Sequence, residues 1–463
     1  MTRRLQAAAL GLLCSGLVAC QGGSNSAASS SPVTARADAG QAQVVVAVID
    51  SGINVYHDFF HAGSDIYAKS APSAVTPEVL DAFDIGPEQI ISLSRSGDFF
   101  ADFAQDAQIW NNIRPFQFYW FEGTNIIATT HQIADLAAGN IPILPDTESD
   151  THGVGTSAAV LTANPEAIVL FVEPNGLGSV DSHELAFTHP AVDMISTSYG
   201  VSIPGVAYPI PETANFEFSY QGMVELGKMH FSSAGNAPGF SPFRAGAGPW
   251  WSIGVSGIEE GTSEGRTSLS GIFPDFVSDF VQDLPYCQAC QNGTRSVGGT
   301  SFSTPRAAGV ASKILLEARR AAGHTGGIKL IDGEAFMVAA NDVFITNWQL
   351  RRAMEEAAWV PPIGDYDPVE GVLDLGALPV NPVAPWLQIG WGDLTADPDK
   401  AVVSEALAQL GFGEVTRVKE AGFCEHQTAW IEARKAYWNN LAFGSESFGT
   451  SADPFEYCDG LLP

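Results

Sequence analysis

The chain has 463 residues, of which 45% are hydrophobic, and it contains 47 glycines and 28 prolines. This composition is typical of a loop-rich globular protein and excludes disorder over most of the length. The 22 basic and 52 acidic residues give a formal net charge of -30. Such a charge repels nucleic acid and anionic lipid, so it argues against a polyanionic partner.

Residues 1–20 have the layout of a secretory signal peptide. Arg3 and Arg4 precede an apolar run that is too short for a stable transmembrane anchor. The run ends in LVAC, which resembles the lipobox of bacterial lipoproteins, so we expect cleavage before Cys20 and lipidation of that cysteine. The protein would then be anchored in the bacterial envelope, with the outer membrane favoured because Gln21 is not aspartate. The alternative is an ordinary signal peptide and a secreted protein.

The folded part is expected to begin after a flexible Ser/Ala/Gly-rich linker, residues 21–43. Residues 44–49, VVVAVI, form an unbroken apolar run, which predicts a parallel strand that is buried on both faces. It ends at Asp50, and the carboxyl ends of such strands form the functional crevice of α/β sheets. Similar runs at 167–174, 191–200, 229–238 and 250–257 predict further strands separated by helices.

The pattern predicts an α/β fold with a mainly parallel sheet and helices on both faces, spanning residues 44–412. Within it, residues 60–145 read as a large insertion with helices of its own. Pro305 predicts a helix with this proline in its first turn, and residues 347–360 predict an amphipathic helix. Residues 413–463 read as a C-terminal extension.

Four short motifs carry the candidate chemistry. They place Asp50 in VAVIDSG, His152 in DTHGVGTSAA, Asn236 in SSAGNAPG and Ser301 in GGTSFSTPRAAG. Each motif alone fits an ordinary turn or helix cap. A serine becomes a nucleophile when a neighbouring imidazole takes its proton, and a carboxylate then fixes the tautomer of that imidazole.

In this order the motifs resemble the subtilisin-like serine peptidases. The resemblance implies a serine endopeptidase with Ser301 as nucleophile, His152 as base and Asp50 as its ionised partner, while Asn236 and the Ser301 N–H bind the oxyanion. It also implies an extended protein or peptide substrate and no required cofactor. The substrate-binding residues that it implies are Ser198, Tyr199, Gly200, Ser233, Ala234 and Gly235. These residues are small or uncharged, which favours a large apolar side chain before the scissile bond.

Four cysteines remain in the mature chain, and an oxidising compartment favours disulfides between Cys287 and Cys290 and between Cys424 and Cys458. A four-cysteine zinc site is the rival interpretation, although only one C-x-x-C is present. No catalytic metal is expected. Asp146, Glu148 and Asp150 allow a structural calcium ion, but their spacing fits no defined calcium loop, and a solvated acidic face is favoured.

Two alternative functions stay open. The first is a catalytically inactive subtilisin-like binding protein, because Thr151 and Val154 depart from the family pattern around His152 and residues 21–43 leave no room for a folded inhibitory propeptide. The second is a sedolisin-like acid peptidase with a glutamate base, against which His152 itself argues. We expect a monomer that binds its substrate and, through its lipid, a membrane.

Overall fold

The computed structural model describes residues 42–61, 75–132, 140–176, 180–199, 224, 227–236, 247, 252–258, 274–324, 329–331, 334–360, 373–374, 379–380 and 390–417. These residues all belong to one compact unit, residues 33–463. Cys20, Gly200, Cys424 and Cys458 lie outside the described residues, as do the signal peptide and most of the linker and C-terminal extension. Within the described ranges, no helix has the length and apolar character needed to cross a membrane.

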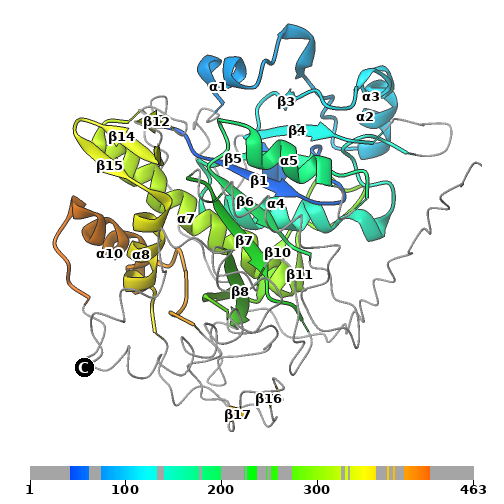
Figure 1. Cartoon of the computed structure of the whole chain (residues 1–463). Helices are drawn as coiled ribbons and strands as arrows, with labels where there is room; N and C mark the ends of the chain where they lie inside the picture. The colour runs from blue at the N-terminus through cyan, green and yellow to red at the C-terminus, as the bar shows by residue number, and fades with distance from the viewer. Residues whose placement is uncertain are drawn as a thin grey trace, which may run out of the picture. The chain divides into compact units, whose positions relative to one another are not determined.

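A nine-stranded sheet forms the centre of this unit, in the order β2-β3-β4-β5-β1-β6-β7-β8-β9 (Figure 1). Every neighbouring pair is parallel except β3 and β4. The strands are β1 (Val45–Ile49), β2 (Ile90–Ile91), β3 (Tyr119–Phe121), β4 (Ile126–Thr130), β5 (Ile168–Glu173), β6 (Met194–Thr197), β7 (Met229–Ser233), β8 (Ile253–Ile258) and β9 (Phe276–Asp279).

Strand β1 lies inside the sheet, between β5 and β6. Val46 and Val48 pack into one hydrophobic cluster, whereas Val45, Ala47 and Ile49 pack into a second one. Burial on both faces explains the unbroken apolar run. The chain builds β4 and β5 on one side of β1 and later β6 on the other, so the carboxyl end of β1 is a switch point of the topology, where α/β sheets place their sites.

Helices cover both faces of the sheet. The first cluster includes residues of α4 (His152–Ala163), α7 (Thr300–Ala322), α8 (Asn347–Ala357) and α10 (Val402–Leu407). The second includes residues of α1 (Pro77–Ala82) and α5 (Val180–Thr188). The expected architecture, a mainly parallel sheet between two helical layers, is confirmed.

The remaining elements are short. The helices are α2 (Phe99–Gln105) and α3 (Ala107–Asn112), and the single turns are η1 (Asp58–Phe60), η2 (Pro87–Gln89), η3 (Glu148–Asp150), η5 (Pro398–Lys400) and the π-helical η6 (Ala408–Phe412). The two-stranded antiparallel pairs are β10 (Val281–Leu284) with β11 (Arg295–Gly298), β12 (Lys329–Ile331) with β13 (Glu334–Phe336), β14 (Val338–Ala340) with β15 (Val343–Ile345), and β16 (Leu373–Asp374) with β17 (Pro379–Val380). Segment 60–145 contains α1, α2 and α3 and also supplies β2, β3 and β4 to the central sheet.

One expectation about α7 is wrong. The helix begins at Thr300, so Pro305 lies beyond the first turn. The carbonyl oxygen of Gly299 accepts hydrogen bonds from the N–H groups of Phe302 at 2.9 Å and Ser303 at 3.2 Å, and these bonds start the helix earlier than the proline requires. Proline has no N–H to donate, so the carbonyl oxygen of Ser301, four residues before it, lacks its usual partner within the helix.

Candidate active site

The structure brings Asp50 and His152 into direct contact. Asp50 follows the last residue of β1 and is 2% exposed, and His152 is the first residue of α4. The Nδ1 atom of His152 lies 2.9 Å from both carboxylate oxygens of Asp50. The carboxylate also accepts the N–H of Ser51 at 2.8 Å and the hydroxyl of Thr156 at 3.0 Å. The carboxylate is therefore surrounded by hydrogen-bond donors and binds the Nδ1 edge of the imidazole.

The two groups shift each other's pKa in opposite directions. Burial raises the pKa of Asp50, but the charge of His152 and the hydrogen bonds from His152, Ser51 and Thr156 outweigh it, so the net shift is downward. Burial lowers the pKa of His152, but the charge of Asp50 and its hydrogen bond outweigh it, so the net shift is upward from 6.5. Asp50 is consequently ionised at neutral pH, and His152 is a stronger base than a free imidazole.

Ser301 is the second residue of α7 and is tied to the carboxyl end of β6. Its hydroxyl donates to the carbonyl oxygen of Ser198 at 3.1 Å, and the hydroxyl of Ser198 donates to the carbonyl oxygen of Ser301 at 2.7 Å. The second bond satisfies the oxygen that Pro305 leaves without an intrahelical partner.

His152 lies beside the first turn of α7. Its ring packs against that of Phe302, the residue after Ser301, with 5.5 Å between the centroids. Among the described residues, the Ser301 hydroxyl is hydrogen-bonded to Ser198 and not to His152. Catalytic hydrogen bonds are often formed only when substrate is bound, so this arrangement is compatible with a triad.

Asn236 is fastened to the start of α7 through its amide oxygen. That oxygen accepts both the backbone N–H and the hydroxyl of Thr300, each at 2.8 Å. The Thr300 hydroxyl in turn accepts the N–H of Gly235 at 3.0 Å. Gly235 has φ = 108°, a conformation that favours glycine. With its oxygen occupied and no partner for its NH₂ group among the described residues, the Asn236 side chain can donate to a ligand beside the N–H groups of the first turn of α7.

The predicted substrate-binding residues occupy the carboxyl ends of two neighbouring strands. β6 and β7 pair in parallel, so Ser198 after β6 and Ser233 at the end of β7 reach the same edge of the sheet. Ala234 follows, with its N–H bonded to the carbonyl oxygen of Val255 at 2.9 Å. Gly200 lies outside the described residues.

Tyr199 is oriented by a contact that the sequence does not reveal. Its hydroxyl is hydrogen-bonded to Nε2 of His183 on α5, and the two rings meet edge to face with centroids 5.6 Å apart. Burial and the nearby charge of Asp50 raise the pKa of Tyr199. The side chain therefore packs against the α5 layer, and its backbone is the part that remains along the expected substrate edge.

Thr156 and Thr300 are functional candidates to which the sequence motifs assign no role. Thr156 is four residues after His152, so both side chains lie on one face of α4 and reach Asp50 together. Thr300 joins Asn236 to α7. The spacing of four residues within a helix is the signal that could have found Thr156.

The acidic residues before His152 are already engaged with protein donors. Asp146 accepts the N–H of Ile141 at 2.8 Å, and Asp150 accepts that of Thr147 at 3.1 Å. Glu148 accepts the N–H of Gln288 at 2.9 Å and pairs with Arg295 at 3.1 Å. Each of the three carboxylates therefore has a protein donor, and among the described residues only Glu148 of the three pairs with a cation, so a structural calcium ion at these residues stays a prediction.

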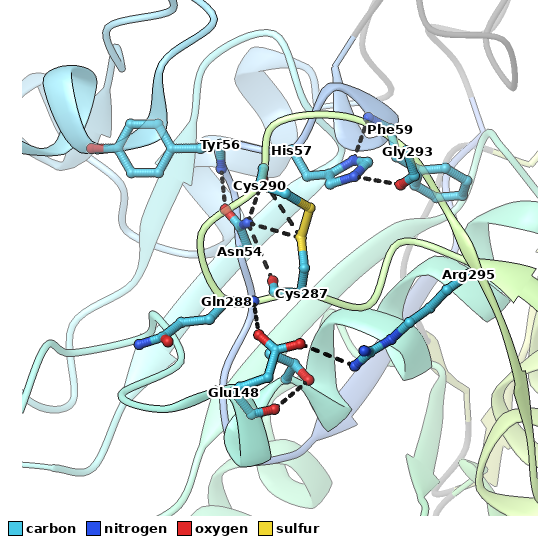
Figure 2. Close-up of a disulfide and its surroundings, with 11 residues drawn as sticks. Asn54, Tyr56, His57, Phe59, Glu148, Cys287, Gln288, Cys290, Gly293 and Arg295 are labelled. Carbon is cyan, nitrogen blue, oxygen red and sulfur yellow. Dashed lines mark hydrogen bonds and ion pairs between the residues drawn. A yellow bond between two sulfur atoms is a disulfide. The ribbon is translucent and has the colours of Figure 1, made fainter. Parts of the chain in front are cut away.

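In the part of the chain that the structure describes, the one cluster with the makings of a metal site consists of His57, Cys287 and Cys290, whose ligand atoms lie within 4.8 Å of one another. The two cysteines form a disulfide, the first of the two expected (Figure 2). Nδ1 of His57 accepts the N–H of Phe59 at 3.1 Å, and Nε2 is hydrogen-bonded to the carbonyl oxygen of Gly293 at 2.9 Å. With the sulfurs joined and both ring nitrogens engaged, the oxidised cluster is a structural one.

Comparisons with known proteins identify a matching family model and a set of similar solved structures. Solved structures similar to this chain include the prenylagaramide maturation protease PagA (14% identity, 81% of this chain and 95% of that one, TM-score 0.42), a lanthipeptide protease (14%, 80% and 89%, 0.42) and a cold-adapted subtilisin-like serine proteinase (16%, 60% and 76%, 0.33). No curated protein matches. The model of the subtilase family matches residues 41–331. Because this match takes in more than half of the 463 residues, the chain belongs to the subtilase family of serine peptidases.

Proposed function

We propose that the protein cleaves peptide bonds with Asp50, His152 and Ser301 as its catalytic triad, and that it does so while anchored to the bacterial envelope through Cys20. The observation that carries the first part is the contact of His152 Nδ1 with both oxygens of Asp50, at 2.9 Å, beside the first turn of α7. This contact holds the imidazole in the tautomer whose Nε2 accepts a proton.

In the proposed reaction the hydroxyl of Ser301 leaves the carbonyl oxygen of Ser198 and gives its proton to Nε2 of His152 as its oxygen attacks the substrate carbonyl. Asp50 remains ionised and stabilises the imidazolium. The developing oxyanion accepts hydrogen bonds from the NH₂ group of Asn236 and the N–H of Ser301. His152 then protonates the leaving amine, and water releases the acyl group from Ser301.

The substrate is proposed to lie extended between residues 198–200 and residues 233–235, as an added strand at the carboxyl edge of the sheet. Ser198, Ser233 and Ala234 are small and buried and carry no charge. A large apolar side chain before the scissile bond would suit such walls better than a charged one. The enzyme needs no metal for this reaction.

Casein hydrolysis by the wild type and three purified variants tests the triad. We expect the Ser301→Ala and His152→Ala variants to lose activity by a factor on the order of 10⁶, because members of such a triad act as one unit. Ser303→Ala is the matched control, since Ser303 lies on the same helix but its buried hydroxyl donates to the carbonyl oxygen of Asp279 at 3.0 Å. If neither the wild type nor any variant hydrolyses casein, the alternative of an inactive binding protein is favoured instead.

Palmitate labelling in a bacterial host tests the anchor separately. The proposal predicts incorporation into the full chain and its loss in the Cys20→Ala variant. Cys14→Ala is the control, because Cys14 lies inside the segment that is cleaved away. Label that persists in the Cys20→Ala variant would refute the lipid anchor and leave the peptidase proposal untouched.

A further inference from the structure

Residues 285–294 form the loop between β10 and β11, and we name it the cystine loop. This loop binds the segment that follows Asp50 (Figure 2). The side-chain amide of Asn54 donates to the carbonyl oxygen of Cys290 at 2.7 Å. Nε2 of His57 is hydrogen-bonded to the carbonyl oxygen of Gly293 at 2.9 Å. Both contacts join the loop to residues within a few positions of the carboxylate that holds His152.

The same loop also binds the segment that leads into His152. The side-chain amide of Gln288 donates to the carbonyl oxygens of Asp146 at 2.7 Å and Pro145 at 3.2 Å. The backbone N–H of Gln288 donates to the carboxylate of Glu148 at 2.9 Å. Gln288 thus makes three hydrogen bonds to the residues that set where α4 begins.

A third connection runs toward Ser301. Glu148 pairs with Arg295, the first residue of β11, at 3.1 Å, and β11 ends two residues before α7 begins. Both side chains are about half exposed, so this ion pair by itself contributes little. The position of this ion pair matters more than its strength, because it joins β11, which precedes Ser301, to the segment that precedes His152.

The disulfide fixes the shape of the cystine loop. Cys287 and Cys290 are three positions apart, with 5.9 Å between their Cα atoms. The side-chain amide of Asn54 reaches the carbonyl oxygens of both cysteines, at 2.7 Å and 3.4 Å. Residue Gln288 lies inside the ring that the disulfide closes, so the bond restrains the residue that holds the His152 segment.

We infer that the cystine loop is a clamp that keeps Asp50 and His152 in contact. Gln288 and Glu148 are its positioning residues, and the Cys287–Cys290 disulfide restrains its conformation. This inference rests on the proposed triad. Displacing a catalytic group by about 1 Å costs on the order of 10² in rate, so opening the clamp lowers catalysis while the sheet and its helices stay folded.

The first test is chemical reduction in a Cys424→Ser/Cys458→Ser background, which leaves the disulfide of the clamp as the one under test. Dithiothreitol passes two electrons and two protons to the Cys287–Cys290 bond, giving two thiols, and becomes a cyclic disulfide. We expect the rate constant for fluorophosphonate labelling to fall about tenfold, equivalent to about 1.4 kcal/mol, and to recover on reoxidation. A further Cys287→Ala/Cys290→Ala change should give the low rate with and without reductant. An unchanged rate on reduction, with both thiols shown free by alkylation, would overturn the inference.

The second test separates positioning from simple stabilisation. Glu148→Ala removes the acceptor of the Gln288 N–H, whereas Glu148→Gln keeps a carbonyl oxygen in its place. We expect Glu148→Ala and Gln288→Ala to lower kcat several-fold with little change in KM, and Glu148→Gln to restore most of it. Asp283→Ala, an exposed change on β10 of the same hairpin, is the control with wild-type kcat. Losses that appear only as a lower melting temperature, with normal kcat at 25 °C, would assign the loop a merely structural role.

Hydrogen exchange distinguishes failure of the clamp from failure of the proposed function. Reduction should increase deuterium uptake over residues 145–151, whether or not the protein hydrolyses peptides. If the wild type does not react with fluorophosphonate, the triad proposal fails, and this exchange still decides whether the loop restrains the His152 segment. Unchanged uptake over those residues would refute the clamp on its own.

Discussion

Replacing Asp50 with asparagine keeps the size of the side chain and removes its charge. The carboxylate accepts hydrogen bonds from four donors, namely Nδ1 of His152, the N–H of Ser51, the hydroxyl of Thr156 and, at 3.4 Å, the hydroxyl of Ser51. Asparagine has one acceptor oxygen, so at least one of these groups must then face an NH₂ group at a position that is 2% exposed, either as an unsatisfied donor or, for His152, with its proton moved to Nε2 so that Nδ1 accepts. An unsatisfied buried donor costs about 1–3 kcal/mol in stability.

The catalytic cost is larger than the cost in stability. Without the carboxylate, the imidazole of His152 is free to take the tautomer whose Nε2 carries the proton, and that tautomer cannot accept one from Ser301. We therefore expect Asp50→Asn to lower kcat by about 10⁴, equivalent to about 5 kcal/mol in the barrier.

The pH dependence of the activity tests the role of Asp50 independently. His152 must be neutral to act as base, and its pKa lies above 6.5 in the wild type because Asp50 holds the charged form. Activity should therefore rise with pH through that raised pKa. In Asp50→Asn, burial remains and the two raising causes are gone, so the inflection should move to lower pH.

Hydrolysis of a fluorogenic peptide between pH 5 and pH 9 measures both quantities, and circular dichroism shows that the variant is folded. A variant within tenfold of the wild type, or an inflection that stays where it was, would refute the role given to Asp50.

Three further predictions concern the oxyanion cradle and the core. Asn236→Ala should lower kcat by about 10²–10³ with KM nearly unchanged in steady-state assays, the magnitude known for the equivalent kind of asparagine in subtilisin. Asp193→Ala should cost about 3–5 kcal/mol in urea unfolding, because it removes the carboxylate that neutralises the buried guanidinium of Arg319, 2.5 Å away; wild-type stability would contradict this. Gly309→Ala should lower stability by about 1–3 kcal/mol, because its Cβ would lie 2.5 Å from the carbonyl oxygen of Val160 where α7 crosses α4.

Much of the sheet could be predicted from the sequence because its central strands are buried on both faces. The unbroken run at 44–49 corresponds to β1, and the run at 167–174 contains β5. The position of Asp50 after β1 predicts a site at the carboxyl edge, and the structure places His152 there. The strands at one side of the sheet are harder to predict, because β2 has two residues and β3 has three, which are too few for a periodic signal.

The details of the site depend on contacts between distant residues. The start of α7 depends on Asn236, which binds the N–H of Thr300 across 64 positions, so the local preference of Pro305 does not decide it. The direction of the Tyr199 side chain depends on His183, which the packing of α5 brings close. Propensity and spacing carry no information about such pairs, so a sequence can name the catalytic groups without showing how they are held.

The serine that a fluorophosphonate modifies shows which hydroxyl of the protein is the activated nucleophile. The wild-type protein is treated with the probe, digested, and the modified peptide is sequenced by mass spectrometry. We expect a single adduct on Ser301, lost in His152→Ala and unaffected in Ser303→Ala. An adduct on a different serine, or a folded wild-type protein that takes up no probe, would contradict it.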